Sequence, residues 1–272
     1  MGDGAGWFYA MDRATGRVRW RSRAAAPVMS SATVAGKLVI FGSDDGGVYA
    51  LRTGDEPIRR VVYWSPDLAK AASYRGAEDL AAYFRDRGYE QADEDGVAAL
   101  MQRVVEGDKG PRGGAGSVVV FALDHLPPVL LKPVGGVPLL RAYLDAGGKV
   151  VWPGIPPRIW PRDPATGDAG GLDRIRWDAP TDLLGVDFGA TMFNLRSART
   201  TAEGDRWGLE GRWRARWGIE PSEPTRVLAL DDFGHAATWV EEYGGGPGTG
   251  FVMAPGVPLD MVYRLAEARP PR

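Results

Sequence analysis

Short apolar segments alternate with amphipathic helical segments from residue 59 to residue 152, and this alternation constrains the fold more than any other feature. The apolar runs are continuous, which is typical of strands buried on both faces of a parallel sheet. Strands separated by helices indicate βαβ units, so we expect an α/β fold with a mostly parallel sheet flanked by helices. The predicted strands are 59–64, 117–123 and 149–152, and the predicted helices are 77–88, 95–107 and 139–146.

Three further apolar runs, at 226–230, 236–243 and 250–255, predict closing strands of the same sheet. We expect the parallel strands to follow the flavodoxin-like order. The long stretch between strand 149–152 and residue 226 is rich in Trp, Arg, Gly and Asp. It predicts an irregular insertion at about residues 155–225, in which Trp213 and Trp217 share one face of a helix and the arginines between 206 and 216 point outward. Binding of nucleic acid through that segment is not expected.

The N-terminal residues carry a repeat. Tyr9-Ala10 and Tyr49-Ala50 are 40 residues apart, the length of one four-stranded propeller blade. The run from Tyr9 to Gly16, together with Trp20, resembles the quinoprotein-type (PQQ-like) β-propeller repeat. The resemblance implies an antiparallel β-segment of about one blade over residues 1–56. Since a quinone site needs a complete ring of blades, pyrroloquinoline quinone is not an expected cofactor.

The repeat starts in mid-blade, so the chain is expected to be the tail of a longer propeller protein or a shortened product. A single blade exposes strand edges that invite pairing. Two alternatives stay open, a small sheet packed on the second domain and a homodimer formed through the exposed β-edges.

The absence of cysteine excludes disulfides, thiolate metal sites and thiol nucleophiles together. The formal net charge of −2 and the sequence pI of about 5.8 give no general attraction to nucleic acid or to a membrane surface. No signal peptide and no apolar run long enough to span a bilayer is visible, so a cytoplasmic location is the default expectation.

Residues 138–154, with the sequence PLLRAYLDAGGKVVWPG, and residues 237–256 resemble the class I glutamine-amidotransferase-like superfamily, in particular its trehalose-utilisation-type branch. The resemblance implies that residues 57–272 form one such domain. Catalytic members place a nucleophilic Cys directly after the strand, where this chain has Pro153 and Gly154. Cys-dependent amidotransferase chemistry is therefore ruled out.

Ligands of open parallel sheets bind at the carboxyl ends of the strands. That rule predicts a crevice bordered by Ser65, Asp67, Asp124, His125 and Gly154. Asp124 and His125 could act as a general base with its orienting group, or as two ligands of a divalent metal. The simpler alternative is an aspartate that caps the next loop beside an exposed histidine.

Two more groups of residues are candidates. Trp160 could stack on a sugar ring, and Arg162 could bind a carboxylate or phosphate, with Asp163 assisting catalysis; the alternative is a surface ion pair beside a packed indole. A second metal site could use acidic and imidazole ligands of one hairpin, although such tips are commonly solvated turns. Those ligands are Asp231, Asp232 and His235.

Two functions follow from these residues. The first is a non-catalytic protein that binds a small polar ligand, carbohydrate-like because of the trehalose-utilisation-type resemblance and the many tryptophans, with no cofactor. The alternative is a thiol-independent hydrolase or sugar-modifying enzyme that uses Asp124 and His125, with or without a divalent metal. Whether the protein is an enzyme is left open by the sequence.

Overall fold

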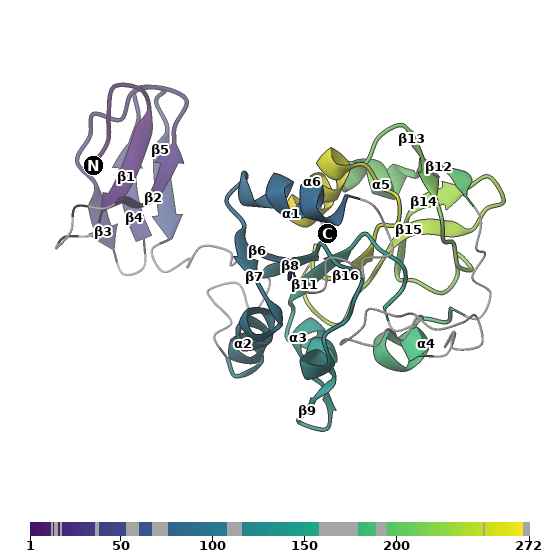
Figure 1. The fold of residues 1–272 in the computed structure, drawn as a ribbon. Coiled ribbons are helices and arrows are strands. Elements are labelled where there is room, and N and C mark those ends of the chain that lie inside the picture. The colour runs from purple at the N-terminus through teal and green to yellow at the C-terminus, as the bar shows by residue number, and fades with distance from the viewer. Residues whose placement is uncertain are drawn as a thin grey trace. The chain divides into compact units, whose positions relative to one another are not determined.

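The computed structural model contains two compact units, residues 1–55 and residues 56–272, each with its own hydrophobic core (Figure 1). The structure describes residues 1–11, 13, 16, 18–35, 38–52, 60–66, 76–107, 116–157, 179–188, 195–246 and 248–268.

The first unit consists of two small antiparallel sheets. One pairs β1 with β2, and the other has the order β3-β4-β5. Phe8 and Phe41 stack across the unit with ring centroids 4.2 Å apart, and Tyr49 stacks on Phe41 at 5.4 Å. An N-terminal antiparallel segment is thus confirmed. Its strands are β1 (Trp7–Met11), β2 (Val18–Arg23), β3 (Thr33–Ala35), β4 (Leu38–Gly42) and β5 (Val48–Arg52).

The 40-residue repeat is visible in the hydrogen bonds of this unit. The Tyr9 hydroxyl donates to Asp3 Oδ2 at 2.9 Å, and the Tyr49 hydroxyl donates to Asp45 Oδ2 at 2.6 Å. Each aspartate therefore ties the turn before its strand to the tyrosine within that strand. Pairing of two copies through the strand edges stays a prediction.

The second unit is built on a nine-stranded sheet of order β13-β12-β14-β15-β16-β11-β8-β6-β7 (Figure 1). Its parallel part, β7-β6-β8-β11-β16, has the flavodoxin-like order. β6, the first of these strands in the sequence, lies between the second, β7, on one side and the third, fourth and fifth, β8, β11 and β16, on the other. The predicted fold class is confirmed. These strands are β6 (Arg60–Tyr63), β7 (Glu90–Ala92), β8 (Val118–Phe121), β11 (Lys149–Trp152) and β16 (Gly250–Met253).

Four antiparallel strands extend the sheet beyond β16, and two of them lie inside the segment expected to be irregular. They are β12 (Arg196–Thr200), β13 (Arg212–Ala215), β14 (Arg226–Asp231) and β15 (Ala236–Glu241). The prediction that Trp213 and Trp217 lie on one helix is wrong. Residues 212–215 alternate between exposed and buried positions, so the period of two describes them better than the period of a helix.

Helices cover both faces of the parallel strands (Figure 1). Side chains of α2 and α3 share one core with Val119, Phe121 and Trp152, whereas side chains of α1 and α6 share the other with Val120 and Val151. Successive residues of β8 and β11 thus enter opposite cores. The helices are α1 (Ala77–Arg85), α2 (Glu94–Val105), α3 (Leu139–Asp145), α4 (Ala179–Leu184), α5 (Ala202–Arg206) and α6 (Leu259–Glu267). A 3₁₀ turn, η3 (Pro128–Leu131), and a two-residue ladder of β9 (Pro133–Val134) with β10 (Val137–Pro138) precede α3.

The buried lysine at the start of β11 fixes the end of α6. The Lys149 side chain is almost fully buried, and its Nζ donates to the backbone carbonyls of Leu265, Ala266 and Ala268. It also lies 4.9 Å from the ring centroid of Trp207. A cation at the carboxyl end of a helix satisfies carbonyls that have no partner within the helix. No described helix is long and apolar enough to cross a membrane.

Candidate functional site

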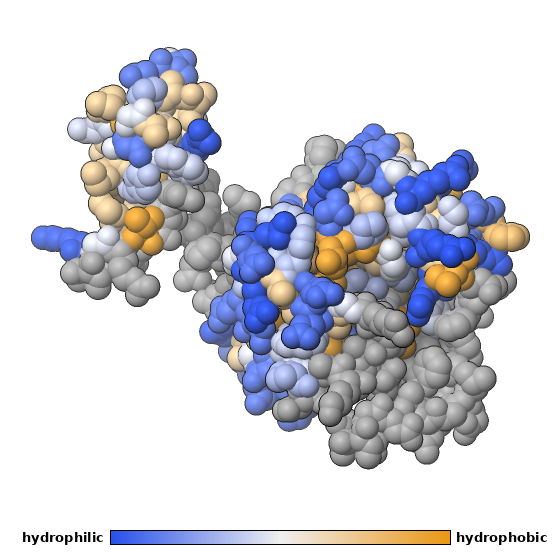
Figure 2. Space-filling model, turned by 45° about the horizontal axis from the view of Figure 1, so that its top comes forward, coloured by the Kyte–Doolittle hydropathy of each residue, from blue (hydrophilic) through white to orange (hydrophobic). Residues whose placement is uncertain are grey.

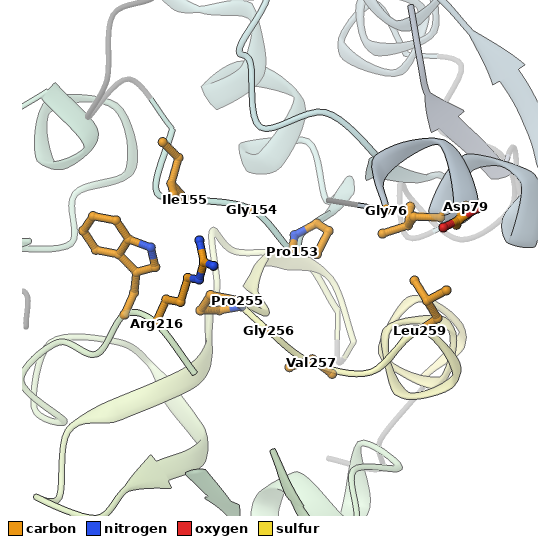
Figure 3. A pocket seen from close by; sticks show the side chains of 12 residues that line it. Gly76, Asp79, Pro153, Gly154, Ile155, Arg216, Pro255, Gly256, Val257 and Leu259 are labelled. Atoms are coloured by element: carbon orange, nitrogen blue, oxygen red, sulfur yellow. The ribbon is translucent and has the colours of Figure 1, made fainter. Parts of the chain in front are cut away.

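A pocket of about 530 Å³ lies at the carboxyl ends of β11 and β16 (Figure 3). This is the edge of a parallel sheet at which ligands of α/β folds bind. Its walls come from five parts of the chain: the first turn of α1, the turn after β11, the residues after β13, the turn after β16 and the start of α6. The lining residues are Gly76, Asp79, Leu80, Pro153, Gly154, Ile155, Arg216, Trp217, Pro255, Gly256, Val257 and Leu259.

The floor of the pocket is formed by two Pro-Gly turns, one after each strand. In the first, the indole N–H of Trp152 donates to the carbonyl of Ile155 and fixes the turn around Pro153. Gly154 packs against Asp124 so closely that a β-carbon there would lie 2.2 Å from the Asp124 β-carbon. Only glycine fits at this position without a shift of the neighbouring loop.

The second turn is equally restricted. Gly256 has φ +74°, and a β-carbon there would lie 2.2 Å from the carbonyl oxygen of Arg214. The amide of Val257 donates back to the carbonyl of Ala254 at 3.3 Å, which closes the turn. Both turns therefore bring backbone and proline rings, without a polar side chain, to the floor of the pocket.

The electrostatics of the pocket come from two helix ends and two side chains. The helices α1 and α6 both begin at the pocket after Gly76 and Pro258, which have no side chain that could cap the first N–H groups. The positive ends of both helix dipoles thus lie beside it. Arg216 and Asp79 lie at opposite ends of the pocket with the Pro-Gly turns between them (Figure 3).

Of the predicted ligand-binding residues, Gly154 lines this pocket, and Asp124 lies directly behind Gly154 with 8% of its surface exposed. Ser65 and His125 are described but are not among the lining residues. The predicted Asp67, Trp160, Arg162 and Asp163 lie outside the described residues.

Arg216, Trp217 and the first turn of α1 were not among the predicted site residues. A usable signal was present, because Pro-Gly follows an apolar strand twice, at Pro153-Gly154 and at Pro255-Gly256. Two such turns at the ends of neighbouring parallel strands lie side by side, since β11 pairs directly with β16.

The structure gives the residues of the second metal candidate another role. Asp231 Oδ1 accepts hydrogen bonds from the amides of Phe233 and His235, at 2.8 and 2.9 Å, and Oδ2 lies 3.1 Å from His235 Nδ1. Asp232 is exposed at the tip of the hairpin. The Asp231 carboxylate therefore organises the β14–β15 turn. Among the described residues, no three His, Cys, Asp or Glu side chains gather as a metal site would require.

Burial alone would raise the pKa of Asp231, but the hydrogen bonds from His235 and Phe233 hold that pKa below its ordinary value of 3.8. A carboxyl with a lowered pKa stabilises the fold above its unfolded-state pKa, and this contribution is lost as the pH falls through the folded-state pKa. Asp231→Asn is expected to lower the free energy of unfolding by about 1–2 kcal/mol near neutral pH.

Urea unfolding of wild type and Asp231→Asn over a series of pH values checks this expectation. The difference in stability between the two proteins should shrink as the pH falls below about 4. Asp232→Asn is the matched control, because its side chain is exposed at the same hairpin tip, and it should leave stability unchanged. A difference between wild type and Asp231→Asn that stayed constant across the pH range would contradict the role of the charge.

Comparison with known families gives two matches. A model described as the MJECL34 family matches residues 69–267, and a PQQ_2 repeat model, described as outer membrane protein assembly factor BamB, matches residues 1–100. The second match supports the PQQ-like repeat at the N-terminus. Neither model is of an amidotransferase-like family, so that predicted resemblance gains no support from them. No curated protein matches the chain.

Proposed function

The chain belongs to the MJECL34 family, and we propose that its α/β unit is a non-catalytic domain that binds a small, polar, carbohydrate-like molecule in the pocket at the ends of β11 and β16. The observation that carries this proposal is the pocket itself, of about 530 Å³, with opposite charges at its two ends and backbone turns as its floor. That volume suits a small ligand of the size of a sugar.

The lining residues support binding rather than catalysis. Among the described lining residues there is no Ser, Thr, Lys or His, and the chain has no Cys. A covalent mechanism would depend on Asp79, which is solvent-exposed at the start of α1. The residues after the elbow strand, Pro153 and Gly154, offer neither a nucleophile nor, at the proline, a backbone N–H for an oxyanion.

The chemistry of the walls favours a hydroxylated ligand. Trp217 and Ile155 offer an apolar surface on which a sugar ring can lie, Arg216 offers guanidinium donors, and Asp79 offers acceptors for hydroxyl groups. The flavodoxin-like order and the Gly-Gly helix end before β11 are features shared with amidotransferase-like domains. We therefore keep a degenerate domain of that kind as the proposed origin of the unit.

The proposal is tested by isothermal titration calorimetry with galactose and galacturonate as probes. Both are expected to bind wild type, and Leu259→Trp is expected to abolish binding of both because the indole fills the pocket from the start of α6. Arg216→Ser should weaken the binding of galacturonate by about tenfold, because one charge-assisted contact is lost. The binding of galactose should weaken much less.

Arg103→Ser is the matched control, because Arg103 is exposed on α2 and does not line the pocket. This variant should bind both sugars as wild type does, so that the loss in Arg216→Ser reflects position and not charge alone. Equal affinity of wild type and Leu259→Trp, or no binding of either sugar to wild type, would overturn the proposal.

A thiol-independent hydrolase remains a second candidate, favoured by the close contact of Asp124 with the Gly154 turn. It predicts turnover of nitrophenyl esters or glycosides that is lost in both Asp124→Asn and His125→Ala. The chain has two histidines, so His235→Ala is the matched control and should keep full turnover. Absence of turnover in wild type would exclude this candidate and leave the binding function.

A further inference from the structure

A row of arginines occupies one face of the sheet edge formed by β12 and β13. In this antiparallel pair, Arg199 lies directly opposite Arg212, and Ser197 lies directly opposite Arg214. Directly opposed residues project from the same face of a sheet, so these four side chains share one face. We name Arg199, Arg212 and Arg214 the arginine row. All three are exposed, and β13 is the last strand of the sheet.

The opposite face of the same two strands is different. Ala198 pairs with Trp213 there, and both side chains are buried in the core shared with α1 and α6. The three arginines of the row share the exposed face. The fourth arginine of the two strands, Arg196, lies on the opposite face, where its guanidinium is 3.5 Å from the ring centroid of Phe233. Figure 2 shows hydrophilic side chains spread over the displayed face of the unit, with hydrophobic side chains between them.

The arginine row is electrostatically unfavourable in the isolated protein. Like charges directly opposite each other on neighbouring strands repel. Two carboxylates in the segment that joins β12 to β13 pair with other arginines: Glu203 pairs with Arg206 and Arg226, and Glu210 pairs with Arg264. No acidic side chain among the described residues forms an ion pair with the row. An uncompensated cluster of this kind is complementary to a ligand that carries several anionic groups.

The geometry of the arginine row fits a linear ligand. Arg212 and Arg214 are two positions apart on one strand, which separates their anchor points by about 7 Å. Guanidinium groups bind carboxylate or sulfate through two parallel hydrogen bonds, so each arginine can hold one anionic group of a chain. Arg216 follows β13 directly and lines the pocket, so the row leads to one end of the proposed ligand site.

We propose that the arginine row extends the pocket into a binding site for an acidic oligosaccharide, whose repeated carboxylates or sulfates meet the arginines while one terminal sugar occupies the pocket. The inference rests on the proposed function for the nature of the sugar in the pocket. Single-stranded nucleic acid fits less well, because the aromatic residue of β13, Trp213, is buried on the other face and offers no surface for stacking bases.

The experiment measures fluorescence anisotropy of a labelled galacturonic-acid hexasaccharide. Wild type is expected to bind it at least about tenfold more tightly than galacturonate alone, with affinity that falls as salt is raised. The double variant Arg199→Ser with Arg212→Ser should lose most of this gain and still bind galacturonate normally. Its midpoint of urea unfolding should equal or exceed that of wild type, because a repulsion has been removed.

The matched control is the double variant Arg85→Ser with Arg103→Ser, which removes two exposed arginines elsewhere on the unit and should bind the hexasaccharide as wild type does. A hexasaccharide that binds no better than galacturonate, or that is unaffected by the row variant, overturns this inference and leaves the proposed function intact. If the hexasaccharide binds through the arginine row while galacturonate does not bind, the arginine row is supported as a binding surface and the proposed binding of a sugar in the pocket is overturned. Equal competition by a single-stranded DNA oligonucleotide of the same charge overturns the choice of an acidic sugar.

Discussion

Replacement of Lys149 by methionine is expected to lower the free energy of unfolding of the α/β unit by about 3–4 kcal/mol. Methionine has nearly the shape of the lysine stem, so little packing is lost. It cannot donate, and the carbonyls of Leu265, Ala266 and Ala268 at the end of α6 would then be left without their shared donor in a buried site. Urea unfolding followed by tryptophan fluorescence measures the change.

Lys132→Met is the matched control, since Lys132 is exposed before the small β9–β10 ladder. Its effect should stay within about 0.5 kcal/mol. The end of α6 has further attachments, because Glu267 accepts from Tyr89 at 2.8 Å and pairs with Arg60 at 2.8 Å. A Lys149→Met protein as stable as the control variant would show that these contacts hold α6 without the lysine.

Gly256→Ala is expected to have the second large effect, a loss of about 3 kcal/mol or more. The substitution combines two costs. An alanine at φ +74° is strained in any surroundings, and its methyl group would lie 2.2 Å from the Arg214 carbonyl oxygen, which is backbone and cannot rotate away. The same change should distort the second Pro-Gly turn, so binding in the pocket should also be lost.

Gly234→Ala separates the two costs. Gly234 has φ +89° in the β14–β15 turn, and nothing lies within 4 Å of an added β-carbon. It should therefore show the strain alone, about 1–2 kcal/mol. If the two variants lost the same stability, the close approach of the Gly256 turn to β13 would not exist in solution.

Much of the sheet could be predicted because its central strands are buried on both faces. Runs such as residues 118–121 and 150–152 contain apolar residues at every position, a pattern that fits a covered parallel strand. β7 was missed for the opposite reason. It has the sequence Glu90-Gln91-Ala92, its first two residues are exposed, and it is an edge strand without a hydrophobic signal.

The region around β13 shows how spacing alone misleads. Trp213 and Trp217 are four residues apart, which fits one face of a helix, yet β13 ends at Ala215 and the two indoles belong to different cores. The pairing of β13 with β12 decided the outcome, and long-range pairing is not encoded in a local period. The helix α6 carries a sequence signal from which it could have been predicted. Its buried residues fall at helical spacing after a proline; they are Met261, Val262, Leu265 and Ala266.

The position of the site could be predicted only in part. The general rule placed it at the carboxyl edge of the sheet, and the pocket lies there. The rule did not supply Arg216 or Asp79, because they reach the edge from β13 and α1, whose places in the fold depend on pairing and packing across the chain. Asp124 was selected for its chemistry, whereas its described contact at this edge is steric, because it leaves no room for a β-carbon at Gly154.

Small-ligand binding at the two Pro-Gly turns is tested most directly by amide chemical shifts, measured by NMR during a titration with galacturonate. The amides of Gly154 and Gly256 should shift together and saturate with one dissociation constant, while the amides of Gly135 and Gly234, which lie in turns away from the pocket, should not move. Saturating shifts confined to other parts of the chain, with Gly154 and Gly256 unmoved, would contradict the account.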